Sequence, residues 1–206
     1  MAPYLTLYPN SINPKHIQQA VQTLNAGGII IYPTDTVYAL GCLCTHKKAL
    51  NRLAQLKGVR LEKAAFSFLF ENISALSHYV KPLDNATFRR LKSTLPGPYT
   101  YILETHNRIP KPFDKRKTLG IRIADHPVLK ALLPLLSAPL ITTSLHDEDQ
   151  IKDYTTEPDE IFENWSSQID LMLACGVGGN VPSTVVDLTT TEPTLIRAGK
   201  GPFEFD

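Results

Sequence analysis

The sequence predicts a single α/β domain over residues 1–206 whose many short strands permit antiparallel pairing. Three observations favour this class. Helical and strand patterns alternate along the chain, which is typical of helices packed on a sheet. The apolar runs are short and bounded by glycine or proline, as buried strands are. The length allows one sizeable core, and no repeat or linker divides it.

The first elements follow from capping and apolar spacing. Asn13, which precedes a proline, predicts the start of a helix whose apolar residues recur at helical spacing until Gly27. An apolar run over residues 28–32 follows and is expected to be a buried strand. A second helical pattern ends at Lys57, where Gly58 permits a turn.

The remaining elements follow the same two patterns. The expected strands cover residues 64–70, 99–103, 120–124, 139–143, 171–173 and 184–188, and a further strand ends at Arg197. The expected helices cover residues 73–79, 86–94, 127–136 and about 157–165. A Pro-Gly-Pro break at residues 96–98 fixes a loop, and the acidic stretch 147–164 is expected to be part loop, part helix.

Three polar residues follow the strand expected at 28–32: Thr34, Asp35 and Thr36. Strand ends in α/β sheets often carry ligand-holding groups, and these hydroxyls and carboxylate could hold an amino group and a hydroxyl of a small ligand. A capped turn explains the same residues. From composition alone, both interpretations stay open.

Cations follow the second helix. Lys57, Arg60 and Lys63 fall within seven residues, where a loop could fold them around one anion. Arginine grips a phosphate or carboxylate in a fork, and lysine adds a mobile point charge. A solvated basic turn explains the triplet equally well. No G-x-x-x-x-G-K-[ST] motif occurs in the sequence, so a P-loop would not hold a nucleotide here.

Further polar residues lie at or near strand ends. Arg122 falls inside an expected strand, where a charged side chain needs a partner. Thr142 and Ser144 lie at the terminus of another strand and could contact phosphate oxygens, while Ser183 precedes a strand. The six histidines show no Ser-His-carboxylate order, so covalent acyl transfer has little support.

The charges are unevenly distributed although the net charge is only +1. Of the 21 Lys and Arg residues, 17 fall between Lys47 and Lys130, and nine of the 20 Asp and Glu residues fall between Asp147 and Asp170. A near-neutral total can therefore conceal one basic and one acidic face. A basic face suits the phosphates of a nucleotide or of RNA, and solvated helices are the alternative explanation.

The cysteines favour a reducing compartment, and the hydropathy gives no sign of a membrane span. An odd number of cysteines, Cys42, Cys44 and Cys175, in a chain of this size favours core thiols over disulfides. A metal site at Cys42, Cys44 and His46 lacks a second cluster to complete it. No apolar stretch is long enough to span a bilayer and no secretory signal begins the chain, so we expect a cytoplasmic location.

Six segments occur together in an order that resembles a known family. They are YPTDTVYALG at 32–41, LPGPYT at 95–100, GIR at 120–122, TSL at 143–145, PSTVVD at 182–187 and IRAG at 196–199. The order is similar to that of the YrdC/YciO family, and the Tyr-Ala-Leu-Gly and Thr-Ser-Leu variants look most like its YciO branch. The resemblance extends over a core of about residues 10–201.

The resemblance implies an open, twisted mixed sheet similar to the DHBP synthase fold, with a positively charged concave face associated with double-stranded RNA or tRNA. In the best-understood branch this cleft is a nucleotidyltransferase site that makes threonylcarbamoyl-adenylate from L-threonine, bicarbonate and ATP, with Mg²⁺, for tRNA threonylcarbamoyladenosine. Carried over by position, the threonine-binding residues would be Thr36, Arg122, Thr142 and Ser183. The ATP-binding residues would be Lys57, Arg60, Lys63, Ser144 and Arg197, with Lys57 and Arg60 catalytic.

This chain departs from the synthase branch at two places. It has Lys57-Gly58-Val59-Arg60 where the synthases have Lys-x-Arg, and Ser144-Leu145-His146 where they have Ser-Ala-Asn. The first change shifts the arginine, and the second removes an amide that can both donate and accept. Three functions therefore stay open: a threonylcarbamoyl-adenylate synthase, a YciO-type protein that binds structured RNA without completing the adenylate, or, between them, action on a preformed threonylcarbamoyl group.

Overall fold

The computed structural model describes residues 1–106, 109–145 and 156–204. Within these residues the strands are β1 Tyr4–Thr6, β2 Ile30–Tyr32, β3 Ala39–Leu43, β4 Ser67–Leu69, β5 Tyr99–Glu104, β6 Thr118–Arg122, β7 Leu140–Ser144, β8 Leu171–Ala174, β9 Thr184–Asp187 and β10 Thr194–Arg197. The α-helices are α1 Pro14–Asn25, α2 Lys47–Leu56, α3 Asn85–Thr94, α4 Pro127–Leu132 and α5 Pro158–Trp165. Short 3₁₀ helices cover η1 Leu61–Lys63, η2 Ile73–His78 and η3 Leu133–Leu135.

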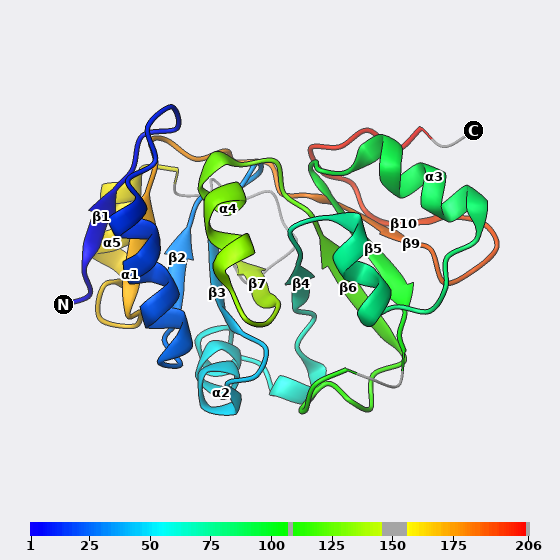
Figure 1. The fold of residues 1–206 in the computed structure, drawn as a ribbon, viewed down its shortest axis with the longest axis horizontal. Coiled ribbons are helices and arrows are strands. Elements are labelled where there is room, and N and C mark those ends of the chain that lie inside the picture. The colour runs from blue at the N-terminus through cyan, green and yellow to red at the C-terminus, as the bar shows by residue number, and fades with distance from the viewer. Residues whose placement is uncertain (107–108, 146–155, 205–206) are drawn as a thin grey trace.

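All the described strands join in one mixed sheet. Their order is β1-β8-β2-β3-β7-β4-β6-β5-β9-β10, and Figure 1 shows the sheet running across the whole molecule. The sheet contains parallel pairs, such as β4 with β6, and antiparallel pairs, such as β3 with β7. This arrangement confirms the predicted α/β class with a mixed sheet and flanking helices.

The two faces of the sheet are covered by different helices because side chains alternate along each strand. Ile30 and Tyr32 of β2 pack with the buried sides of α1 and α4, which lie next to each other on the near face in Figure 1. The neighbouring residues Ile29 and Ile31 belong to the other apolar cluster, together with α2 and Ile161 of α5. The sheet is therefore the centre of a three-layer arrangement.

Several predicted elements are correct in place but differ in extent. The helix expected over 127–136 ends at Leu132 and continues as the 3₁₀ turn η3, because Pro134 lacks the N–H that an α-helix requires. The helix expected over 73–79 is the 3₁₀ helix η2, and the strand expected over 64–70 is shortened to β4. The part of the acidic stretch at 147–155 lies outside the described residues.

Two strands were absent from the prediction. β1 is a three-residue strand that pairs in parallel with β8. β3 returns antiparallel to β2, with Tyr32 opposite Ala39 and Ile30 opposite Gly41. Residues 33–38 are therefore a connection between two adjacent buried strands, and we call them the β2–β3 connection.

The local signals read from the sequence are confirmed at the helix ends. The Asn13 side chain accepts from the N–H of Lys15 at 3.0 Å, and Gly58 adopts a positive φ of 65° after α2. The three cysteines are buried and form no disulfide, and burial raises the pKa of Cys42 and Cys44 to about 12. No helix among the described residues is long and apolar enough to cross a membrane.

Candidate functional site: an arginine- and hydroxyl-lined cleft

A cleft of about 350 Å³ is lined by the β2–β3 connection and by residues on or beside β4, β5, β6, β7, β9 and β10. Three arginines line it: Arg116, Arg122 and Arg197. Eight hydroxyl-bearing residues join them, namely Thr36, Ser67, Thr100, Thr118, Thr142, Thr143, Ser144 and Ser183. No carboxylate side chain lines the cleft within the described parts of the chain, so its lining favours anions.

The β2–β3 connection is held by a directional chain of hydrogen bonds. The Thr34 hydroxyl donates to the carbonyl oxygen of Val37 at 2.7 Å. Because that uses its only hydrogen, the contact of 3.0 Å between the Thr34 and Thr36 hydroxyls must be donated by Thr36. Thr34 Oγ1 also accepts from the Thr36 N–H at 3.1 Å. Thr34 thus caps the turn, while Thr36, which is 1% exposed, lines the cleft.

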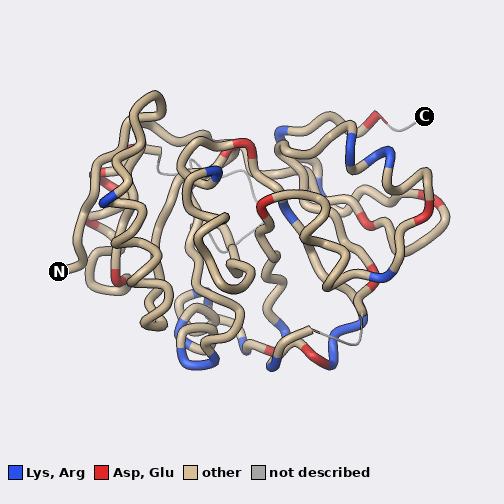
Figure 2. The backbone as a smooth tube through the Cα atoms, viewed as in Figure 1, with Lys and Arg blue, Asp and Glu red and all other residues tan. Residues whose placement is uncertain are grey.

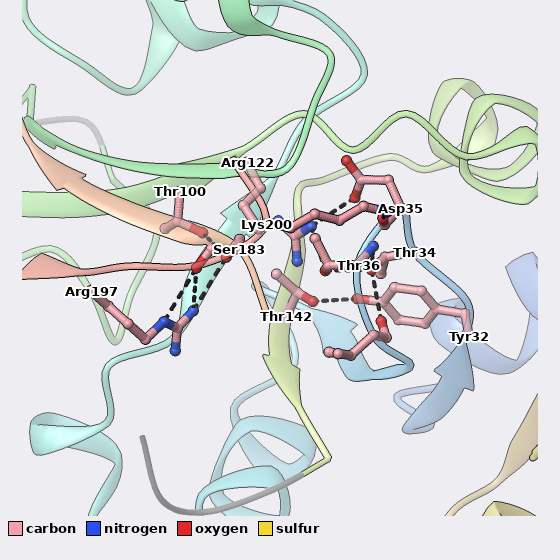
Figure 3. Close-up of polar contacts among 11 residues, drawn as sticks. Tyr32, Thr34, Asp35, Thr36, Thr100, Arg122, Thr142, Ser183, Arg197 and Lys200 are labelled. Atoms are coloured by element: carbon pink, nitrogen blue, oxygen red, sulfur yellow. Dashed lines mark hydrogen bonds and ion pairs between the residues drawn. The ribbon is translucent and has the colours of Figure 1, made fainter. Parts of the chain in front are cut away.

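Arg122 ends β6 beside this connection, and its partner is Asp35. Its Nη2 donates to Asp35 Oδ1 at 2.8 Å and to Thr36 Oγ1 at 3.1 Å, as Figure 3 shows. The Arg122 and Asp35 side chains are only 8% and 10% exposed. Burial lowers the pKa of Arg122 from its usual value, while Asp35 opposes that change. The partner that an arginine inside a strand requires is therefore supplied by the chain itself.

This ion pair leaves two buried atoms unsatisfied. Asp35 Oδ2 and Arg122 Nε have no hydrogen-bond partner in the described structure. An arginine and a carboxylate often form two parallel bonds, but here a single oxygen makes the contact. The buried pair is therefore only half formed.

Tyr32 holds the side chain of Thr142, which lines the cleft. The buried Tyr32 hydroxyl donates to Thr142 Oγ1 at 2.7 Å, a contact visible in Figure 3, and burial raises the pKa of Tyr32. The Tyr32 ring fits because residue 41 is glycine, since a Cβ there would approach the ring to 2.8 Å. The apolar motif at 32–41 thus carries a structural tyrosine and the glycine that makes room for it.

Ser183 and Arg197 form the opposite wall. Arg197 donates from Nη2 to the Ser183 carbonyl oxygen at 2.9 Å and from Nε to the same oxygen at 3.2 Å. The hydroxyl oxygens of Ser183 and Thr100 lie 2.9 Å apart. Gly199 packs against the backbone around Ser183, where a Cβ would meet main-chain atoms at 2.5 Å. This wall is held by backbone contacts as well as side chains.

The three cations predicted after α2 do not lie together in one environment. Lys57 is buried and donates from Nζ to the Ser144 carbonyl oxygen at 3.0 Å, so it lies beside the β7 end of the cleft without lining it. Arg60 and Lys63 are exposed, and neither belongs to the lining. Six of the predicted site residues do line the one cleft: Thr36, Arg122, Thr142, Ser144, Ser183 and Arg197.

Sequence reasoning missed Arg116. Its Nη2 donates to the carbonyl oxygens of Leu61 at 3.2 Å and Ala64 at 2.7 Å, and its guanidinium lies 5.0 Å from the centre of the Phe113 ring. Burial lowers the pKa of Arg116. In the sequence Arg116 stands between two lysines, which resembles a solvated basic run. Only the fold shows that this arginine ties η1 to the cleft.

Two glycine-rich segments, at residues 176–179 and 199–201, make close contacts beside the cleft. A Cβ at Gly179 would overlap the Thr36 carbonyl oxygen, and one at Gly178 would meet the Tyr38 ring at 2.6 Å. In the second segment, Lys200 donates from Nζ to the Asp35 carbonyl oxygen at 2.6 Å. The first segment therefore packs directly against the β2–β3 connection, and the second contacts it through Lys200.

Comparison with known proteins shows that the chain belongs to one protein family. The Sua5/YciO/YrdC family model, whose description is "Telomere recombination", matches residues 22–199. This match confirms the resemblance carried by the six sequence motifs.

Within the family, the chain is similar to proteins of two kinds. YciO of Escherichia coli K12, described as an uncharacterized protein, is 35% identical over 204 residues, which cover 98% of this chain and 97% of the relative. The crystal structure of E. coli YciO has a TM-score of 0.89 and covers 98% of both chains. A threonylcarbamoyl-AMP synthase of Pseudomonas fluorescens Pf-5 is 31% identical over 176 residues, or 84% of this chain and 93% of the synthase.

The fold also occurs in a larger protein. The crystal structure of P. abyssi Sua5 complexed with L-threonine has a TM-score of 0.82 and covers 95% of this chain, which spans 57% of that protein. The identity is 24%, so this likeness shows a shared fold.

Proposed function

We propose that this protein is a threonylcarbamoyl-AMP synthase of YciO type, which forms L-threonylcarbamoyl-AMP from L-threonine, bicarbonate and ATP. The observation that carries the proposal is the cleft lining: three arginines and eight hydroxyl-bearing residues, with no carboxylate within the described parts of the chain. Each of the three substrates brings a carboxylate, a carbonate or phosphates. Kinship with a threonylcarbamoyl-AMP synthase at 31% identity supports the same assignment.

The residues divide the cleft into two ends. Arg122, Thr36 and Thr142 form the end beside the β2–β3 connection, where they would take the carboxylate and hydroxyl of L-threonine, with Ser183 on the facing wall. Ser144 and Arg197 would face the nucleotide. Lys57 lies beside Ser144, and the exposed Arg60 and Lys63 would reach a triphosphate that extends out of the cleft.

The proposed chemistry requires no nucleophile on the protein. The threonine amine and bicarbonate give a carbamate and water. A carbamate oxygen then forms a bond to the α-phosphorus of ATP, and the bond to the β-phosphate oxygen breaks, so that pyrophosphate leaves with the electron pair. Arginines and lysine contribute by positioning these anions and neutralising the charge that develops on them.

The described residues do not build a resident magnesium site. No group of three or more Asp, Glu, His or Cys side chains comes together among them, and the described cleft lining offers hydroxyls rather than carboxylates. We therefore propose that Mg²⁺ enters as the counter-ion of ATP, and we assign no step to a protein-bound metal.

The test is synthesis from the three substrates. Purified protein incubated with ATP, L-threonine, bicarbonate and Mg²⁺ should release pyrophosphate only when threonine is present, and mass spectrometry should detect the acyl-adenylate. Arg197→Ala should lower the rate by about 100-fold, a typical cost of losing one stabilising donor. Lys130→Ala, in an exposed ion pair with Asp125, is the matched control and should leave the rate unchanged.

A blank assay at high protein concentration would contradict the synthase function. If the same preparation then bound tRNA with an affinity that fell steeply with salt, the RNA-binding function would take its place.

A further inference from the structure

The Arg122 guanidinium is already engaged at the nitrogen that a substrate carboxylate needs. Nη2 has two hydrogens, and one is donated to Asp35 Oδ1 and the other to Thr36 Oγ1. A guanidinium grips a carboxylate at two points through Nη2 together with either Nη1 or Nε. A two-point grip on threonine therefore requires one of the existing bonds to open.

Asp35 is held less completely than Thr36. The Thr36 hydroxyl is tied to Thr34 Oγ1, its backbone N–H bonds to the same oxygen, and the side chain is 1% exposed. Asp35 contacts Arg122 through one oxygen, while Asp35 Oδ2 and Arg122 Nε stay buried without partners. Unsatisfied buried groups cost free energy, so a rearrangement that satisfies them has a driving force.

A second cation lies next to Asp35. Lys200, in the turn between Gly199 and Gly201, donates from Nζ to the Asp35 backbone carbonyl at 2.6 Å, and Figure 3 shows its side chain reaching across to this residue. Lys200 is exposed, and its long side chain keeps rotamer freedom. If the Asp35 carboxylate is released from Arg122, the Lys200 ammonium group, which already contacts the Asp35 backbone, is a nearby cation.

We propose that Asp35 is the internal counter-ion of Arg122, that a substrate carboxylate displaces it, and that Lys200 receives the displaced Asp35 carboxylate. The proposal deepens the proposed function and rests on it for the identity of the substrate, an α-amino acid. Asp35 then sets the affinity of the cleft. A lone anion must overcome the existing ion pair, whereas threonine can add contacts from its hydroxyl to the hydroxyl-bearing lining.

The first test neutralises Asp35 and measures two probes, L-threonine and acetate, by calorimetric titration. Asp35→Asn keeps an oxygen for Nη2 but removes the competing charge, so both probes should bind about tenfold more tightly, the difference between a charged and a neutral hydrogen bond. Glu104→Gln, which removes the same charge from an exposed ion pair with Lys81, should bind both probes as the natural protein does.

The second test uses Lys200 in a double-mutant cycle. Lys200→Met should weaken threonine binding several-fold in the natural background and leave it unchanged in Asp35→Asn, because no displaced carboxylate then needs a partner. Lys200→Arg should restore binding. An equal loss in both backgrounds would show that Lys200 only supports the turn, and would overturn its part in the exchange.

The outcomes separate this proposal from the proposed function. If neither chain binds threonine but Asp35→Asn binds acetate more tightly, the counter-ion role stands and the synthase function falls. Acetate binding that is unchanged or weaker in Asp35→Asn overturns the counter-ion role whatever threonine does. Should Asp35→Asn not fold, a crystal structure of the natural protein with threonine decides. A broken contact between Nη2 and Oδ1 supports the exchange, and an intact one with threonine's carboxylate on Arg122 overturns it.

Discussion

At the scale of residues, Arg122 and Asp35 form a buried ion pair beside the cleft. Both side chains are about nine-tenths buried and two of their atoms lack partners, so their attraction offsets only part of the cost of removing two charges from water. The balance changes when one partner is lost, because the other charge then stays buried without compensation. The pair is therefore more important for what its removal costs than for its net contribution to the free energy of folding.

Arg122→Ala is expected to lower the free energy of unfolding by about 3–5 kcal/mol, as the loss of one partner of a buried pair does. Denaturant unfolding followed by circular dichroism measures this change. Lys130→Ala provides the comparison, since that pair is 62% and 55% exposed and its loss should cost less than about 1 kcal/mol. An Arg122→Ala protein as stable as the Lys130→Ala protein would show that the Asp35 contact is not formed in solution.

Residue types predicted much of the cleft but not its contacts. Residue types marked Arg122, Thr142 and Ser183 as polar residues in or near strands, the family resemblance assigned them to the site, and all three line the cleft. The pairing of Arg122 with Asp35 joins residues 87 positions apart, which no local pattern encodes. Arg116 could not be predicted for a similar reason, because its partners, Leu61 and Ala64, lie more than 50 positions away in the sequence.

At the scale of elements, His126 stands at the start of α4, and the charge of Asp35 in the β2–β3 connection affects its titration. The His126 ring accepts from the Val128 N–H at 3.3 Å and so caps the helix. Burial lowers the pKa of His126 below its usual 6.5, while Asp35 and Asp125 oppose the change. Protonation would turn the capping acceptor into a donor, so the cap and the neutral ring depend on each other.

Stability should therefore fall as the pH drops through this titration. Because the pKa of this histidine is lower in the folded protein, the unfolded chain binds more protons. Its contribution to the free energy of unfolding is therefore fully present above about pH 6.5 and declines below that pH. His126→Asn keeps a capping side chain but does not titrate, and melting curves between pH 7.5 and 5 should show a weaker pH dependence. His78→Asn, at an exposed position, should retain the natural profile, and equal slopes for His126→Asn and the natural protein would contradict the prediction.

Helices and strands whose ends are marked by nearby residues could be predicted from the sequence. Strands that exist only through pairing with distant strands could not. Caps, glycine turns and apolar spacing located the five α-helices and most strands of the described chain. β1 has only three residues and exists through its parallel pairing with β8. β3 is buried at all five positions, so it shows no alternation of apolar and polar side chains that would distinguish it from the rest of the motif at 32–41.

At the scale of the whole molecule, the cleft depends on the order of strands in the sheet. β7, β4, β6, β5 and β9 are neighbours in space although they come from distant parts of the chain, and together they bring the cleft's arginines and hydroxyls to one place. Figure 2 shows lysines and arginines gathered along α2 and the segment that follows it, and along α3. Several of the basic residues of the sequence therefore lie together along α2, the segment after it and α3.

The most direct measurement is a crystal structure of the protein with L-threonine and a non-hydrolysable ATP analogue. The proposed function predicts that both ligands occupy the cleft. The threonine carboxylate should lie within hydrogen-bond distance of Arg122, and the phosphates should lie toward Arg197 and Lys57. A cleft that stays empty at saturating ligand concentrations, or ligands bound elsewhere on the molecule, would contradict it.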